Sequence, residues 1–114
     1  MTIISESQIA ETTFCMYTKS VDITFDSQKD LNNQAERGIS LSEAANQDWD
    51  SWLGAEDVRR DYGEVRYRGY AIMPAENRLY CVVHTYREDA IRIISLRKAN
   101  SREVALYEAT KQTT

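Results

Sequence analysis

Three segments that alternate between apolar and polar residues follow one another in the second half of the chain. They read "EVRYRGYAIM" (64–73), "RLYCVVHTY" (78–86) and "AIRIISL" (90–96), with "PAEN" between the first two and "REDA" between the second two. A period of two residues is typical of β-strands, because successive side chains point to opposite faces of a sheet. Gaps this short leave room only for hairpins. The sequence therefore predicts an antiparallel three-strand meander.

The hairpin loops also predict the register of the meander. A four-residue loop pairs Met73 with Arg78, and a short loop pairs Arg87 with Ala90. This places Tyr67 opposite His84, and it places Thr85 between Arg66 and Arg92, which lie about 10 Å apart across two strand spacings. One face then carries Glu64, Arg66, Arg68, Thr85, Arg87 and Arg92 at one end, and Tyr70, Ile72, Leu79, Cys81, Val83, Ile94 and Leu96 further along. The other face carries Val65, Tyr67, Ala71, Tyr80, Val82, His84, Ile91 and Ile93, and we expect helices to cover it.

The first half of the chain predicts one short strand and two helices. "VDITF" (21–25) alternates like a strand, and a helix capped by Asp26 or Ser27 runs to about Glu36, with Gly38 as its stop. "SLSE" (40–43) has the pattern of a capping box for a second helix, whose end Trp49 and Trp52 cover. A polar loop, "GAEDVRRDYG" (54–63), follows it. The segment "ANSREVALYEAT" (99–110) predicts a last helix that Asn100 or Ser101 caps.

The 114 residues predict an α+β fold, an antiparallel sheet of the meander and the short N-terminal strand packed against helices. We expect residues 21–114 to form one domain and residues 1–20 to be an extension that is either partly disordered or an edge strand. No segment has the pattern of a secretory signal or a membrane span. The two cysteines have no metal-ligand spacing, which indicates reduced thiols in a cytoplasmic protein. We expect no metal and no nucleotide cofactor, because metal spacings and glycine-rich phosphate loops are missing from the sequence.

Charge divides the chain unevenly. Residues 1–57 carry 3 basic and 11 acidic residues, whereas residues 58–103 carry 10 basic and 6 acidic ones. The basic residues of the second part are almost all arginine, whose planar fork of donors matches phosphate. The division suggests that the second part meets an anion and the first part a basic partner. A mixed, solvated surface explains the same charges about equally well.

Several stretches resemble the BrnT family of type II toxin–antitoxin ribonucleases, a branch of the RelE-like toxins. The similarity runs from about Phe25 to Glu108 and is clearest in "GEVR" (63–66), "VVHTYR" (82–87), "IRIISLRKA" (91–99) and "REVALYE" (102–108). "FDSQKDLNNQAERGISLSEA" (25–44) also resembles the family's first helix, except that Glu36-Arg37 stands where the family has Lys-His. The resemblance implies a RelE-like α+β fold, cleavage of messenger RNA that slows growth, and a ribbon-helix-helix antitoxin encoded next to the toxin.

Cleavage of this kind uses the 2′-hydroxyl as nucleophile and needs proton transfer and cations at the phosphate. We predict that Arg66 and Arg92 hold the scissile phosphate, that Glu64 is the base, and that Arg97 is a weaker third cation. Arg97 points away from Arg92 in a regular strand. The predicted RNA-binding residues are Lys29, Arg37, Arg68, Thr85, Arg87 and Lys98.

Two residues that could transfer a proton, Glu64 and His84, also have a plainer interpretation. Glu64 falls opposite Arg87 and is as well explained by an ion pair with it. His84, the only histidine, is better explained as a core residue than as a catalyst, because it lies on the face that helices cover.

The change to Glu36-Arg37 leaves open a second hypothesis, a BrnT-like protein that binds RNA or its antitoxin without cleaving. A third hypothesis is an interaction module with no affinity for RNA, whose acidic first half binds a basic partner helix.

Overall fold

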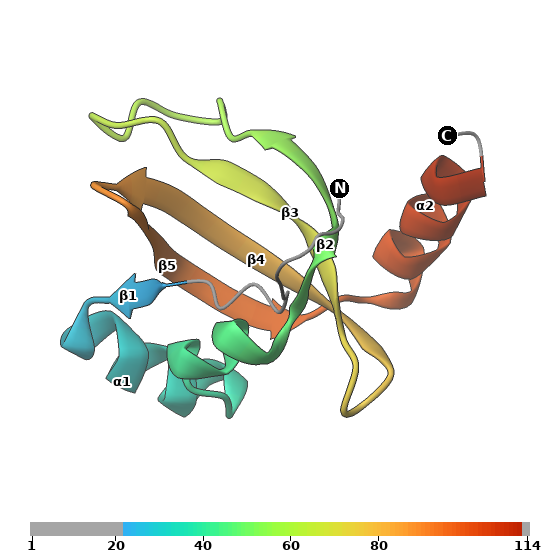
Figure 1. Cartoon of the computed structure of the whole chain (residues 1–114), viewed down its shortest axis with the longest axis horizontal. Helices are drawn as coiled ribbons and strands as arrows, with labels where there is room; N and C mark the ends of the chain where they lie inside the picture. The colour runs from blue at the N-terminus through green and yellow to red at the C-terminus, as the bar shows by residue number, and fades with distance from the viewer. Residues whose placement is uncertain (1–21, 113–114) are drawn as a thin grey trace, which may run out of the picture.

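The computed structural model describes residues 22–112 and contains a five-stranded sheet in the order β1-β5-β4-β3-β2 (Figure 1). Its elements are β1 (Ile23–Phe25), α1 (Ser27–Arg37), the 3₁₀ helix η1 (Leu41–Asn46), β2 (Asp48–Glu56), β3 (Tyr67–Met73), β4 (Arg78–Arg87), β5 (Ala90–Lys98) and α2 (Ser101–Gln112). The predicted edge strand near residues 12–18 lies outside the described residues, so the division at residue 20 stays a prediction. Among the described helices, none is both long and apolar enough to cross a membrane.

The predicted meander is confirmed, and so is most of its register. β3 pairs with β4 through Tyr67–His84 and ends at Met73–Arg78. β4 pairs with β5 through Arg87–Ala90 and Thr85–Arg92. Asn77 and Glu88 adopt left-handed backbone angles in the two turns, with φ of 50° and 57°, a conformation that tight hairpins require.

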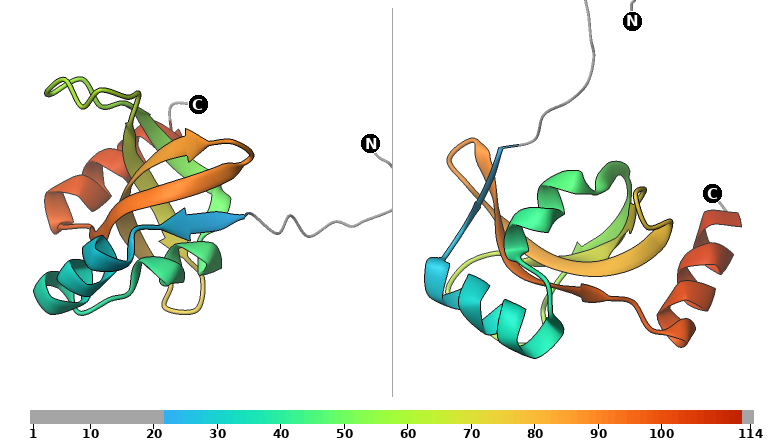
Figure 2. Two further views of the ribbon diagram at one scale, coloured as in Figure 1. Left: turned by 90° about the vertical axis from the view of Figure 1, so that its left-hand side faces the viewer. Right: turned by 90° about the horizontal axis from the view of Figure 1, so that it is seen from below.

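The prediction of a purely antiparallel sheet is wrong in two respects. β1 pairs with β5 in parallel, with Ile23 beside Ile91, so the sheet is mixed. β2 is a fifth strand that the prediction missed: residues 54–56 belong to it, and the polar loop spans only residues 57–66. That loop projects beyond the sheet (Figures 1 and 2). β3 also begins at Tyr67 and not at Glu64, so Arg66 is not paired with Thr85.

Two glycines allow β2 to pair closely with β3. Gly54 and Gly69 are direct partners in the ladder. A Cβ atom on Gly69 would lie 2.7 Å from the Trp52 indole ring and 2.6 Å from the Leu53 carbonyl oxygen. Only glycine therefore lets the indole lie against this part of the sheet.

β5 contains a bulge that changes which face its last residues occupy. The pairing shifts between Val83–Ser95 and His84–Ile93, so Ile94 is the extra residue. Beyond the bulge, Leu96 pairs with Val82 and faces the main core. The prediction that placed Leu96 on the arginine face is therefore wrong. The prediction that Arg97 points away from Arg92 is also wrong, because the extra residue reverses the alternation.

The first helix is confirmed, and the second differs from the prediction. Asp26 caps α1 by accepting a hydrogen bond from the Lys29 amide (3.0 Å), and Gly38 ends it with φ of 74°. η1 is a 3₁₀ helix, and the Ser40 hydroxyl accepts from the Ser42 amide (3.1 Å), not from the amide of residue 43. The predicted capping box at 40–43 is therefore wrong.

Both faces of the sheet are covered. The main cluster comprises Leu41, Ala44, Met73, Tyr80, Val82, Ile93 and Leu96, beneath η1. The second cluster, Leu79, Ala99 and Tyr107, joins the other face to α2, where the Tyr107 hydroxyl donates to the Ser51 carbonyl (2.6 Å). η1 and α2 consequently pack on opposite faces of the sheet.

A buried asparagine ties α1 to β5 just beyond the bulge. The Asn33 amide donates to the carbonyl oxygens of Leu96 and Ile39, both at 2.9 Å, and its side-chain oxygen accepts from the Leu96 amide at 3.4 Å. The side chain thus satisfies backbone groups of β5 that β1, only three residues long, does not reach.

Candidate functional site

Arg92 lies near the start of β5, with Thr85 of β4 on one side and Thr24 of β1 on the other. Its side chain is half-buried, and among residues 22–112 it has no hydrogen bond or ion pair. The Thr85 hydroxyl is buried and donates to the Val65 carbonyl (2.6 Å). Arg92 is therefore a half-buried cation without a partner in the described part of the chain, whereas the hydroxyl beside it is already bonded to the backbone.

Glu64 joins two of the predicted site arginines. The Arg66 Nε lies 3.0 Å from one of its oxygens, and the Arg87 Nη2 lies 3.3 Å from the other. Arg87 shares a sheet face with Arg92, because Arg87 is two residues from Thr85, the residue that pairs with Arg92. We call Arg66, Arg87, Arg92 and Glu64 the arginine cluster. It has three cations and one anion.

The ion pairs hold Glu64 in its charged form. The hydrogen bond from Arg66, followed by that from Arg87, lowers the pKa of the Glu64 carboxyl below its usual value. The predicted pairing of Glu64 with Arg87 is confirmed. A carboxylate shared by two arginines is a weak proton acceptor, so its part as a base stays a prediction that this geometry does not favour.

The projecting loop fixes the position of Arg66. The Asp57 amide donates to the Arg66 carbonyl (2.7 Å), and the Arg66 guanidinium lies 4.5 Å from the centre of the Tyr62 ring. The buried Asp57 carboxylate accepts two hydrogen bonds of 2.8 Å from Arg59 and one of 3.0 Å from Tyr62. These bonds, with that of Arg59 the strongest, hold the pKa of Asp57 far below its usual value. The loop is thus held together by its own hydrogen bonds, and it positions Arg66 within the arginine cluster.

Arg97 and Arg68 lie on the face that α2 covers. The Arg97 guanidinium donates two hydrogen bonds of 2.9 Å to Glu103, and Arg68 lies 3.5 Å from the same carboxylate. Glu103 also accepts from the Tyr70 hydroxyl (2.9 Å) and the Asn100 amide (2.9 Å). The structure therefore brings Arg97 and Arg68 to α2, and their predicted roles in catalysis and RNA binding stay predictions.

Sequence reasoning missed Glu103, although part of its signal was readable. Asn100 and Glu103 form a reciprocal capping box, because the Asn100 side chain accepts from the Glu103 amide at 2.8 Å. The spacing of these two residues in "NSRE" is the sequence signature of that motif. The ion pair with Arg97 could not be read, because it depends on the bulge at Ile94.

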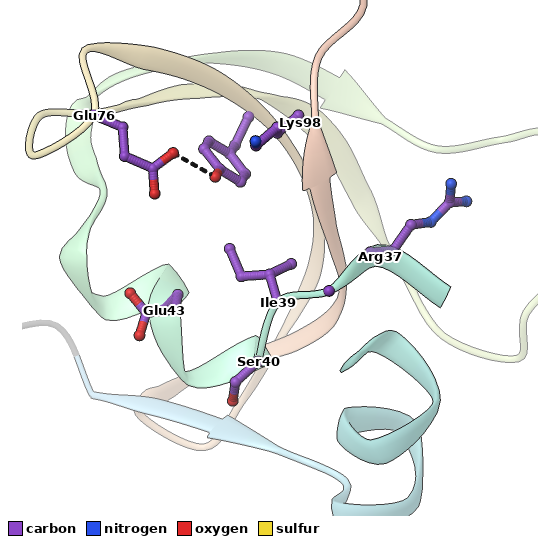
Figure 3. Close-up of a pocket in the computed structure, with 8 residues that line it drawn as sticks. Arg37, Ile39, Ser40, Glu43, Glu76 and Lys98 are labelled. Atoms are coloured by element: carbon purple, nitrogen blue, oxygen red, sulfur yellow. Dashed lines mark hydrogen bonds between the residues drawn. The ribbon is translucent and has the colours of Figure 1, made fainter. Parts of the chain in front are cut away.

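The three other predicted RNA-binding residues are exposed. Lys29 lies in the first turn of α1, Arg37 in its last turn and Lys98 at the end of β5. Arg37 and Lys98 line a hollow of about 390 Å³ together with Glu43, Glu76 and Tyr80 (Figure 3). The hollow lies next to Glu36-Arg37, the two residues that stand where the family that the sequence resembles has Lys-His.

His84 lies inside an aromatic cluster, as expected for a core residue. It is 1% exposed, and its ring contacts those of Trp49, Trp52, Tyr67 and Tyr86 at centroid distances of 5.3–5.6 Å. Burial lowers the pKa of His84 to about 4. At neutral pH the ring is therefore uncharged, and it lies on the face opposite the arginine cluster.

Taken together, the described residues form a small α+β protein with a cationic cluster at one end of a mixed sheet, and guanidinium groups so arranged suit phosphate. The family model of "Ribonuclease toxin, BrnT, of type II toxin-antitoxin system" matches residues 25–103. The chain therefore belongs to the BrnT family of ribonuclease toxins.

A solved structure has the same fold. The ribonuclease toxin BrnT of Brucella abortus aligns with a TM-score of 0.55 and 18% sequence identity, over 71% of this chain and 99% of that one. No curated protein matches the sequence. Among residues 22–112, no group of three or more histidine, cysteine, aspartate or glutamate side chains could hold a metal ion.

Proposed function

We propose that this chain is an endoribonuclease toxin that acts in the cytoplasm, cleaves messenger RNA without a metal and so inhibits translation and growth. The observation that supports the proposal best is Arg92, a half-buried cation without an ion partner among residues 22–112, on the same sheet face as Arg87. Leaving a half-buried charge unpaired costs stability unless a ligand uses it. An RNA phosphate offsets that cost.

In this mechanism the 2′-hydroxyl loses its proton and attacks the adjacent phosphorus, while the 5′-oxygen leaves and takes up a proton. Arg92 and Arg66 stabilise the extra negative charge of the transition state. Arg87 holds Glu64 and thereby orients Arg66, since both arginines bond the same carboxylate. Attack by the 2′-hydroxyl leaves a 2′,3′-cyclic phosphate on one product and a 5′-hydroxyl on the other.

The test uses purified protein, a defined single-stranded RNA and excess chelator. The proposal expects cyclic-phosphate products in the chelator, growth arrest when the protein is expressed, and loss of both in Arg92→Ala. Arg102→Ala is the matched control, because Arg102 is an exposed arginine on α2 without an ion pair among the described residues. Normal growth with intact, folded protein and no products from RNA contradicts the proposal.

One observation favours the alternative, a relative that binds RNA or its antitoxin without cleaving. Among the described residues of the arginine cluster, the only titratable acid–base group is Glu64, and two arginines keep it ionised. His84 lies on the other face, and Glu36-Arg37 replaces the family's Lys-His. This alternative predicts RNA association with steep salt dependence and no products.

We also propose a ribbon-helix-helix antitoxin as the partner, one that neutralises this chain and resembles BrnA. The family is one of toxins from toxin–antitoxin systems. Residues 1–57 have a net charge of −8, with 3 basic and 11 acidic residues, which suits a basic antitoxin segment. Coexpression with the neighbouring reading frame tests this proposal: a stable complex and restored growth support it, and continued growth arrest without complex formation contradicts it.

A further inference from the structure

The hollow beside the end of α1 is built from three distant parts of the chain. The connection from α1 to η1 forms one part, the turn between β3 and β4 a second, and the end of β5 a third (Figure 3). Its volume is about 390 Å³, within the usual range for small-molecule sites. Ile39 and Tyr80 give it apolar surface, and the remaining walls are polar.

Opposite charges share this hollow without neutralising each other. Figure 3 shows the carboxylates of Glu43 and Glu76 along one side, while the Arg37 side chain lies on the other side and points away from them. Among residues 22–112 no ion pair joins either carboxylate to Arg37 or Lys98. A ligand with donors at one end and negative charge at the other fits such an arrangement.

Each carboxylate still has one oxygen without a hydrogen bond from the described residues. One Glu76 oxygen accepts from the Tyr80 hydroxyl (2.7 Å), and one Glu43 oxygen accepts from the side-chain amide of Asn46 (3.0 Å). These bonds fix both carboxylates in the wall of the hollow. The Tyr80–Glu76 bond adds to burial in raising the pKa of Tyr80 to about 12, so its hydroxyl remains a donor at neutral pH.

The bulge in β5 brings Lys98 to this hollow. Lys98 pairs with Tyr80 and therefore shares its face of the sheet, whereas Arg97 faces α2. Without the extra residue, the alternation of the strand would put Lys98 on the opposite face. The same irregularity that gives Arg97 to Glu103 thus supplies the hollow with a cation.

We infer that this hollow binds one guanine nucleotide of the RNA, with the base edge on Glu43 and Glu76 and the phosphate on Lys98. The inference rests on the proposed function, because it takes RNA as the ligand. Guanine presents two adjacent donors, N1–H and the N2 amino group, to a carboxylate. On adenine, cytosine and uracil an acceptor lies next to the donor, and a carboxylate repels it.

The test titrates the full-length protein separately with the 5′-monophosphates of guanosine, adenosine, cytidine and uridine. We expect guanosine monophosphate to bind about tenfold more tightly than the others, in line with the discrimination that one bidentate contact gives. Glu43→Gln should remove most of this preference, and Lys98→Gln should weaken all four nucleotides to a similar extent. Glu36→Gln is the matched control, because Glu36 is exposed on α1 and does not line the hollow.

Equal binding of the four nucleotides, no binding at all, or an unchanged guanosine preference in Glu43→Gln would overturn the inference. The residues changed are exposed, so thermal melting of each variant should match that of the parent. Cleavage of RNA that depends on Arg92, together with equal nucleotide binding, rejects the guanine site and leaves the proposed function standing. Guanosine preference without any RNA cleavage supports the guanine site and rejects the proposed function.

Discussion

Arg97 and Glu103 form a bidentate ion pair, with Nη1 and Nη2 of the arginine each 2.9 Å from a different oxygen of the carboxylate. Glu103 is 8% exposed, and it also completes the cap of α2 through the Asn100 amide. The pair connects the last strand of the sheet to the helix that follows it. It exists because the bulge at Ile94 turns Arg97 toward α2.

Replacing Glu103 with glutamine should destabilise the protein markedly. The substitution leaves the half-buried Arg97 without its charge partner and weakens the cap, so we expect the free energy of unfolding to fall by about 2 kcal/mol. Denaturant unfolding measures the change. Glu108→Gln is the control, since Glu108 is exposed on the same helix and should change stability by less than about 0.5 kcal/mol. Equal losses in the two variants would show that the ion pair does not secure α2.

Stability should fall as the solution becomes acidic, and His84 should contribute first. Burial lowers the pKa of His84 from 6.5 to about 4. The unfolded chain therefore binds this proton at higher pH than the folded chain, and the stability present above pH 6.5 is lost as the pH falls toward 4. The difference corresponds to about 3 kcal/mol. Since His84 is the only histidine, His84→Phe should flatten this part of the curve. An unchanged slope in the variant contradicts the assignment.

A second loss should follow at lower pH. The hydrogen bond from Arg97, aided by those from Asn100 and Tyr70, lowers the pKa of Glu103 from 4.5 to about 2. Stability that depends on the charged carboxylate is present above pH 4.5 and is lost as the pH falls to about 2. Glu103→Gln should reduce this phase and leave that of His84 in place; the remainder belongs to Asp57 and Glu64, whose pKa values their arginine partners also lower. Unfolding curves measured at a series of pH values separate the two phases.

Asn33→Ala should destabilise the protein although it removes a single polar side chain. The substitution leaves the Leu96 carbonyl and amide and the Ile39 carbonyl without their partner, next to the bulge. We expect a loss of about 2 to 3 kcal/mol, because each buried backbone group left unsatisfied is costly. Asn32→Ala on the exposed side of α1 is the control and should cost much less. Similar melting temperatures for the two variants would contradict this role.

The parts of the fold that depend on local sequence could be predicted. Two short loops determined the pairings Met73–Arg78 and Arg87–Ala90, and the alternation then gave the faces of β3 and β4. β2 was missed because its polar start, "DWDS", has the composition of a loop, and only pairing with β3 makes it a strand. The parallel pairing of β1 could not be read either, because it joins residues far apart in the sequence.

The candidate site also has some contacts that the local sequence predicts and others that depend on the bulge at Ile94. Register alone was enough to place Arg92 beside Thr85 and Glu64 near Arg87. Arg97 was misplaced because one extra residue in β5 reverses every later side chain, and no local signal marks Ile94 as that residue. The same reversal explains why the hollow that Lys98 lines was not foreseen.

The salt dependence of RNA binding should distinguish Arg92 from an exposed arginine that does not contact RNA phosphate. A residue that contacts a phosphate displaces a counterion, so its loss lowers the slope of log affinity against log salt concentration by about 0.7 for single-stranded RNA. We expect this change in Arg92→Gln, measured by fluorescence anisotropy with a labelled RNA at several salt concentrations. Arg102→Gln, which removes the same charge from the exposed side of α2, should keep the slope of the parent. Equal reductions in both variants would mean that Arg92 acts only through the overall charge and that RNA phosphate does not contact it.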